Sequence, residues 1–452
     1  MSHLSLRAVR LTAVTLSFPF LSLLAFSDSQ VRIVRLSSIE GVVEIDRGIG
    51  QGFDKAMVNL PVTQGTKLRT ADDGRAEVEF EDGSAIRLAP NTAVEFPQLS
   101  LRDSGEKVST VEIKHGDVYL DFAGAKDNEF TLLLSHQRVT LAHSAHLRAG
   151  MGDVDATVAV FKGDVHIESP SGAVELKKNQ TASFDRLDND RYTLAKNIQQ
   201  EPDDAWDKHQ AEYHVRYASN SYQNYSPYAY GVSDMSYYGS FFNAPGYGMM
   251  WRPYFVGMGW DPFMNGAWAF YPGAGFGWVS SYPWGWTPYH YGTWAFVPGY
   301  GWAWQPGGVW TPWYAQPRVL NAPHGFSVPQ PPRAGTNTVV VNRGPVSMPG
   351  TQSGGRLVIR NDSAGLGIRR GEINNLAKAS QQVQERGAIL QRVHPAPVSQ
   401  MPQSARGPGS AGPASRGSEP MGRGSSAPAA PASRPSSPSP SPSPAGGAHR
   451  GR

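Results

Sequence analysis

Aromatic residues are concentrated in one stretch of the chain, and this limits what the stretch can fold into. Residues 221–320 hold 32 of the 48 Phe, Trp and Tyr residues, and eleven of the 12 Trp lie between Trp251 and Trp313. The same 100 residues contain 16 Gly and four charged residues. Aromatic side chains favour strands, and Gly and Pro favour turns. The stretch therefore predicts short aromatic β-hairpins.

An internal repeat supports the hairpin prediction. The segment GAWAFYPGAG, residues 266–275, returns 26 residues later as GTWAFVPGYG, residues 292–301. Each copy predicts a strand, a Pro-Gly turn and a second strand. Two copies are few for a free-standing repeat structure, which usually needs about three. We therefore expect residues 221–320 to pack on themselves or against another domain.

The clustered rings allow two interpretations. They form the core of a Gly-rich β structure, or they present an exposed platform that stacks on sugars, peptides or other aromatic groups. Nucleic acid is not expected, because a single-stranded site needs a basic groove and this stretch has two Arg. Under the platform interpretation, the candidate ligand-binding residues are Trp268, Trp278, Trp284, Trp286, Trp294, Trp302, Trp304 and Trp310.

Residues 31–195 have a different pattern, which predicts a separate all-β domain. In the segment RAEVEFEDGSAIR, residues 75–87, apolar residues alternate with Glu77, Glu79 and Glu81 before an Asp-Gly turn. Alternation of this kind is typical of a half-buried strand, so the three carboxylates are expected on a solvated face. We expect roughly ten to twelve strands, arranged as a sandwich, a barrel or a solenoid-like stack.

Residues 39–184 contain the segments GTKLRT (65–70), DGRA (73–76), DGSAIRL (82–88) and PNT (90–92), and Gly-Asp-Val steps that begin at Gly116 and Gly163. These motifs are similar to those of the FecR domain. The resemblance implies an extracytoplasmic β-rich domain, which in the founding members relays a signal from an outer-membrane iron-siderophore receptor to a sigma factor. Those members place a cytoplasmic anti-sigma segment and a membrane helix before the domain. Here an export signal precedes it, so the domain alone is expected to carry over.

The aromatic stretch carries a second resemblance. Its segments FGWVS (276–280) and PWGWTPYHYG (283–292) are similar to an uncharacterised Tyr/Trp-rich module found behind FecR-like domains in exported bacterial proteins. The resemblance implies no activity.

The first 27 residues predict a secretory signal peptide. Arg7 and Arg10 precede a mostly apolar run, residues 11–24, and Ala25-Phe26-Ser27 provides the small residues of a cleavage site. The run is shorter than the ~20 residues that span a bilayer. We expect cleavage after Ser27, no transmembrane segment in the mature chain, and a periplasmic or extracellular location.

Two further segments complete the predicted organisation. Residues 201–219 predict a connecting helix with Trp206, Gln210 and Tyr213 on one face. Residues 321–452 are rich in Pro, Ser, Gly and Arg and predict a mostly disordered tail. Within that tail we expect a helix at 372–392 and one β-like pair between residues 339–341 and 357–359.

The sequence offers no clear catalytic or metal site. It has no Cys, no Gly-x-Ser-x-Gly segment and no phosphate-binding GxxxxGK[ST] loop. His136, His143 and His146 are close in sequence, but His143 and His146 would point to opposite faces of a strand. We therefore expect neither an enzyme nor a cofactor or metal site.

The predicted function is non-enzymatic binding or scaffolding in the cell envelope. The expected partner is an envelope polymer, such as a glycan or peptidoglycan, or an envelope protein. The alternative is a periplasmic sensor or signal-relay component that acts through a membrane partner.

Overall fold

The computed structural model describes residues 32–218, 224–313, 318–333, 338–342 and 356–392. The predicted signal peptide and the last 60 residues of the predicted tail lie outside these ranges. The protein is mostly β, as its sequence predicts. We refer to residues 32–195 as the β domain, to residues 224–320 as the aromatic region, and to residues 356–392 as the C-terminal segment.

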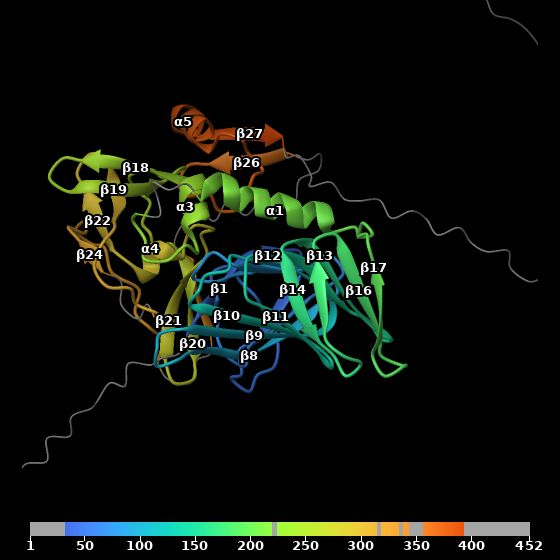
Figure 1. The fold of residues 1–452 in the computed structure, drawn as a ribbon. Coiled ribbons are helices and arrows are strands. Elements are labelled where there is room, and N and C mark those ends of the chain that lie inside the picture. The colour runs from blue at the N-terminus through green and yellow to red at the C-terminus, as the bar shows by residue number, and fades with distance from the viewer. Residues whose placement is uncertain (1–31, 219–223, 314–317, 334–337, 343–355, 393–452) are drawn as a thin grey trace, which may run out of the picture. The chain divides into compact units, whose positions relative to one another are not determined.

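The β domain has two sheets that share one long strand (Figure 1). This strand, β9 (Lys107–Phe122), pairs with β8 and β10 through its first half and with β7 and β12 through its second half. The change takes place at Gly116, whose φ of +83° favours glycine. A Cβ at this position would also lie 2.5 Å from Oγ1 of Thr92.

The first sheet, sheet A, is antiparallel. Its strands, in spatial order, are β4 (Pro61–Val62), β1 (Val34–Glu40), β6 (Arg75–Glu79), β7 (Ala85–Leu88), β9, β12 (Ala145–Met151), β13 (Asp155–Lys162), β16 (Gln180–Asp185) and β17 (Arg191–Ala195).

The second sheet, sheet B, is antiparallel except where β9 and β10 run parallel. Its strands, in spatial order, are β3 (Asp54–Lys55), β2 (Val43–Asp46), β5 (Lys67–Thr70), β8 (Ala93–Leu101), β9, β10 (Asn128–Leu134), β11 (Gln137–Leu141), β14 (Asp164–Glu168) and β15 (Val174–Lys177).

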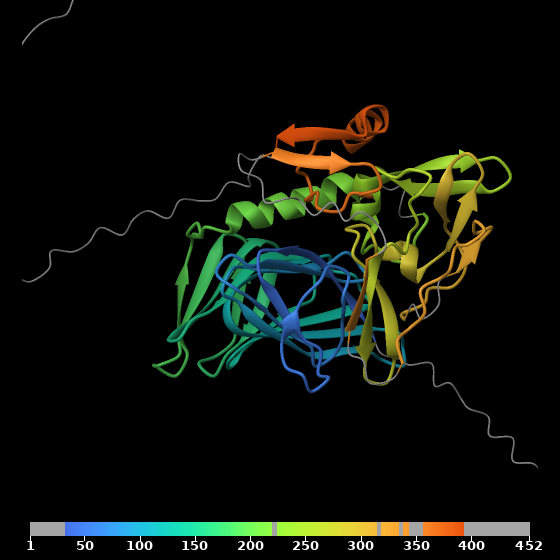
Figure 2. The same cartoon turned by 180° about the vertical axis from the view of Figure 1, so that it is seen from behind.

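The two sheets enclose a hydrophobic core, and Figure 2 shows them from behind. Side chains alternate across each strand, so the apolar set of β6, Ala76 and Val78, faces this core. The count of 17 strands in the β domain exceeds the ten to twelve expected, because several strands are only two to five residues long. Such short strands carry little alternation for a sequence pattern to reveal.

Helix α1 (Asp204–Tyr217) follows the β domain and lies along the outer face of sheet A (Figure 1). Its side chains bond to Arg87 on β7, Tyr119 on β9 and Arg148 on β12. The buried face of the helix includes Trp206, Gln210 and Tyr213, as the sequence predicts, and also Asp207. The helix therefore covers the face of sheet A that points away from the hydrophobic core.

The aromatic region contains three β-hairpins, one more than the two copies of the sequence repeat. They are β18 (Gly239–Ala244) with β19 (Gly248–Pro253), β20 (Asn265–Tyr271) with β21 (Gly275–Ser280), and β22 (Thr293–Val297) with β23 (Gly301–Gln305). Two helices, α3 (Val232–Tyr238) and α4 (Thr287–His290), and the short strand β24 (Val319–Leu320) accompany them.

Residues 338–342 and 356–392 of the predicted tail form three strands and a helix. Strand β25 (Thr338–Asn342) pairs with β20, and β26 (Arg356–Arg360) pairs with β27 (Ala388–Arg392). Residues 339–341 and 357–359 are thus strands, but not partners of each other as expected. Helix α5 (Leu376–Arg386) is shorter than the predicted 372–392, because Gly387 ends it with φ +77° and β27 follows.

Candidate functional site

The three hairpins share one turn motif, Pro-Gly-x-Gly. The turns are PGYG at 245–248, PGAG at 272–275 and PGYG at 298–301. Both glycines of each turn have φ between +78° and +81°, a conformation that only glycine adopts readily. A buried Trp follows each turn by three residues, at Trp251, Trp278 and Trp304.

A second feature also recurs in all three hairpins. A glycine at or just before the first strand packs against the indole of that hairpin's Trp, so the ring covers the position of a side chain. A Cβ on Gly239 would lie 2.3 Å from Trp251, one on Gly266 would lie 2.4 Å from Trp278, and one on Gly292 would lie 2.5 Å from Trp304. The hairpins are therefore three copies of one structural unit, the minimum number that a repeat structure usually needs.

The structure buries seven of the eight candidate platform residues. Trp268, Trp278, Trp284, Trp286, Trp294, Trp302 and Trp304 each expose 3% or less of their surface. Trp310 is part-buried and stacks on His290 and Tyr230. An exposed stacking face is therefore missing at seven positions, which corrects the platform interpretation in favour of an aromatic core.

The core rings contact one another mostly edge to face. Trp268 and Trp278 pair across β20 and β21 with centroids 5.4 Å apart at 73°. This arrangement suits the ring quadrupole. Several indole N–H groups have no hydrogen-bond acceptor among the described residues; these belong to Trp268, Trp278, Trp294 and Trp313.

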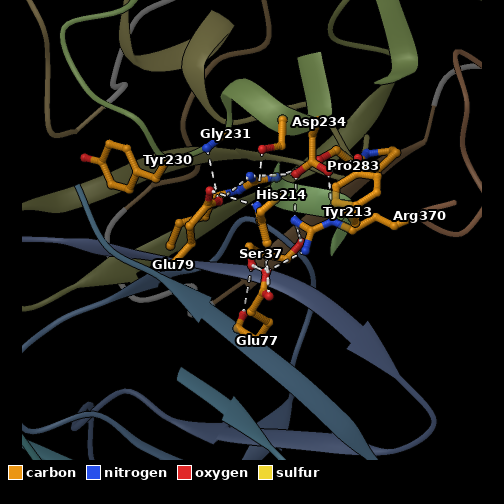
Figure 3. Close-up of polar contacts among 12 residues, drawn as sticks. Ser37, Glu77, Glu79, Tyr213, His214, Tyr230, Gly231, Asp234, Pro283 and Arg370 are labelled. Atoms are coloured by element: carbon orange, nitrogen blue, oxygen red, sulfur yellow. Dashed lines mark hydrogen bonds and ion pairs between the residues drawn. The ribbon is translucent and has the colours of Figure 1, made fainter. Parts of the chain in front are cut away.

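A buried cluster of charged side chains lies where the β domain, the aromatic region and the C-terminal segment meet (Figure 3). We refer to it as the junction network; its charged members are Arg35, Glu77, Glu79, Arg87, Asp207, His214, Asp234 and Arg370.

Arg370 of the C-terminal segment is central to this network. Its guanidinium lies between Glu77 and Asp234 in Figure 3. Nε and Nη2 donate to the two oxygens of Asp234, each at 2.8 Å, and Nη1 donates to Glu77 at 2.5 Å. The planar fork of arginine is suited to such a two-point contact with a carboxylate. One side chain therefore joins β6 of the β domain to α3 of the aromatic region.

Glu77 and Arg35 make further connections. Glu77 also accepts hydrogen bonds from Arg87 at 2.7 Å and Ser37 at 2.7 Å, and contacts His214 at 2.9 Å. Arg35 contacts Glu79 at 3.0 Å and Asp234 at 2.7 Å. It also donates to the carbonyl of Pro283 at 2.6 Å.

The surrounding charges set the ionisation of the buried acids. Burial alone would raise the pKa of Glu77, but His214, Arg370 and Arg87 together hold this pKa well below its usual range. Burial also opposes ionisation of Asp234, and Arg370 and Arg35 lower its pKa overall. Both carboxylates are therefore ionised at neutral pH and matched by arginine charges.

The location of Glu77, Glu79 and Glu81 corrects the sequence interpretation. The three side chains are buried, not solvated. Their alternation with apolar residues correctly predicts a strand, but α1, α3 and the C-terminal segment cover the second face. Arg35 and Arg87, which alternate with apolar neighbours on β1 and β7, were the available signal for a buried polar face.

The three sequence-adjacent histidines do not converge. His136 contacts Asp190 at 2.9 Å, whereas His146 contacts Asp207 at 2.7 Å. His143 is exposed. Across the described ranges, no group of three His, Asp or Glu residues is placed to hold a metal ion.

Comparisons with known families agree with this organisation. Residues 66–166 match the family described as FecR protein. The chain contains a FecR domain. Residues 232–333 match DUF6600, a family of unknown function, so the aromatic region corresponds to a DUF6600 region behind the FecR domain. No curated protein matches the chain.

Solved structures give a more distant comparison. Two crystal structures of a Parabacteroides distasonis ATCC 8503 protein, provisionally described as an anti-sigma factor, match at 18% and 16% identity with a TM-score of 0.27. Each match covers 31% of this chain and 63% of that chain, which is less than two thirds of its length.

Within the part of the chain that the structure describes, no helix is both long and apolar enough to cross a bilayer.

Proposed function

We propose that the protein is a non-enzymatic binding or scaffolding component of the cell envelope. In this proposal the FecR domain and the DUF6600 region act as one structural unit. The junction network is the observation that supports it. Its buried acids and arginines form ion pairs that connect the two regions, so this cluster has the chemistry of a structural contact.

The envelope location is part of the proposal. It is supported by the FecR match, because FecR proteins are envelope-associated, and by the export signal predicted in residues 1–27. The proposed partner is an envelope polymer, such as a glycan or peptidoglycan, or an envelope protein. A rigid two-region unit would present a fixed surface to such a partner.

Fractionation and binding would test this function. The full chain, tagged at its C-terminus, is expected in the envelope fraction with residues 1–27 removed. The purified mature protein is expected to sediment with cell-wall sacculi or to cross-link to one envelope protein. An unprocessed chain in the cytoplasm, or a mature chain that neither sediments nor cross-links, would contradict the proposal.

Signal relay through a membrane partner is the second candidate function. The FecR match favours it, since the founding members of that family act in this way. Capture of a membrane receptor by the cross-linked full chain, with changed transcription after gene deletion, would support relay. Capture of polymer alone, with unchanged transcription, would favour scaffolding.

A further inference from the structure

Arg252 on β19 has no carboxylate partner within the described residues. Its Nη2 donates to the carbonyl of Val256 at 3.1 Å, and its buried Nε has no hydrogen-bond acceptor. A guanidinium has five N–H donors, so the described residues use only a small part of this donor capacity. Arg252 is part-buried. The arginines that are buried each pair with an acid; these are Arg32, Arg35, Arg47, Arg87, Arg148 and Arg370.

The surroundings of Arg252 favour an added anion. Burial lowers the pKa of this guanidinium, and the charge of Asp362 only partly opposes the shift. The carboxylate of Asp362 is itself engaged, since its Oδ1 accepts a hydrogen bond from the backbone N–H of Gly257 at 2.6 Å. A carboxylate bound to Arg252 would compensate the loss of water around its charge.

Apolar side chains lie near Arg252 in the aromatic region. Arg252 pairs with Ser240 across the hairpin, so Phe242 lies on the same face two residues along. Phe242 stacks on Tyr300 with centroids 5.0 Å apart at 22°. A Cβ on Gly301 would lie 3.6 Å from Sδ of Met258 and 3.8 Å from Nη2 of Arg252. Tyr300 is 40% exposed and Met258 is 57% exposed, so the apolar rim is accessible.

We propose that Arg252, Phe242, Met258 and Tyr300 form a binding site for a carboxylate attached to an apolar peptide group. The guanidinium fork matches a carboxylate, and the aromatic and thioether groups would contact the neighbouring apolar side chain. The inference rests on the proposed binding function and specifies the ligand chemistry at one surface of the DUF6600 region.

Three dye-labelled peptides that differ in the presence and position of one carboxylate would test the site by fluorescence anisotropy with the full mature chain. The first ends in Phe with a free terminal carboxylate, and the second is its neutral amide. The third is an amide that carries one Glu beside the Phe. The first and third distinguish a terminal from a side-chain carboxylate, and either one binding more tightly than the neutral amide supports the proposal.

Substitutions at Arg252 and Tyr300 would test whether the peptides bind at the proposed site. Arg252→Gln is expected to weaken binding of the charged peptide about tenfold, which is the loss typical of a charged hydrogen bond. Tyr300→Ser is expected to weaken it while leaving the arginine in place. Arg191→Gln is the matched control, because it removes the same charge from an exposed position on β17. Trp emission like that of the unaltered protein would show that each variant folds.

Equal affinity for all three peptides, or no effect of Arg252→Gln in a folded variant, would overturn the proposal. Sedimentation with sacculi and envelope cross-linking separate this inference from the proposed function. If charged peptides bind through Arg252 but the protein shows neither sedimentation nor cross-linking, the site stands and the envelope function fails. If the protein sediments with sacculi but binds all three peptides equally, the envelope function stands and the proposed site fails.

Discussion

Gly266 lies directly against the indole of Trp278 across the β20–β21 hairpin, and a Cβ at Gly266 would be 2.4 Å from Cζ2 of the ring. The same relationship joins Gly239 to Trp251 and Gly292 to Trp304. The small residue is therefore a packing requirement of each repeat unit, separate from the glycines that form its turn.

Replacing Gly266 by Ala should destabilise the protein. The added methyl group must displace a buried ring or the backbone, and overpacking of this kind costs about 1–3 kcal/mol. Urea unfolding would measure the loss. Gly259→Ala is the matched control, because a Cβ at Gly259 meets no atom within 4 Å. Equal stability of the two variants would contradict the packing described for Gly266.

Removing Arg370 should destabilise the protein more strongly. Arg370→Met leaves Glu77 and Asp234 buried without the guanidinium that joins them, and breaking a buried ion pair in this way costs about 3–5 kcal/mol. Denaturant unfolding followed by Trp emission would report the change.

The neighbouring arginine supplies the control for this experiment. Arg369 is exposed and lies 4.0 Å from Glu40, so Arg369→Gln should change the free energy of unfolding by less than about 1 kcal/mol. Comparable losses for the two variants would mean that the junction network is not what stabilises the contact between the FecR domain and the DUF6600 region.

His290 should make stability depend on pH. Burial lowers its pKa to about 4 in the folded protein, against about 6.5 when unfolded. The unfolded chain therefore takes up a proton first, and stability is lost as pH falls from about 6.5 to about 4. His290→Asn, which retains a donor for the carbonyl of Thr311, should flatten the curve of unfolding free energy in this window. An unchanged slope would exclude His290 as its source.

The Trp emission of the full chain should be blue-shifted and poorly quenched by acrylamide. Ten of the 12 Trp are buried, and only Trp310 and Trp313 are part-buried. Indole rings in a dry core are shielded from water and from the quencher. The same chain in urea provides the exposed reference. Red-shifted, readily quenched emission under native conditions would contradict the aromatic core.

The sequence predicted the hairpins but missed the first copy. Local patterns were sufficient for β20–β21 and β22–β23, because both have the segment Trp-Ala-Phe before the turn. In β18–β19 the corresponding position is Phe241, and Met249 and Met250 follow the turn. The turn PGYG at 245–248 is identical to that at 298–301, so the turn with its following Trp was the better signal.

Local sequence patterns could not predict the junction network, and the reason is physical. Strand alternation places Glu77 and Glu79 on one face but does not say what covers that face. The covering groups come from distant parts of the chain: His214 is 137 residues from Glu77, and Arg370 is 293 residues away. From the sequence alone, a carboxylate on a strand is interpreted as solvated, because the distant cation that pairs with it cannot be identified.

The position of Arg370 has a consequence for the order of events during synthesis. The strand that carries Glu77 is made early, yet one of its principal counter-ions emerges 293 residues later. Until then the carboxylate lacks one of the cations that offset the cost of its burial. Closing so long a loop is also slow. The FecR domain should therefore reach its final stability only after the DUF6600 region and the C-terminal segment have been made, so truncation before residue 370 is expected to yield a nascent domain exposed to proteases.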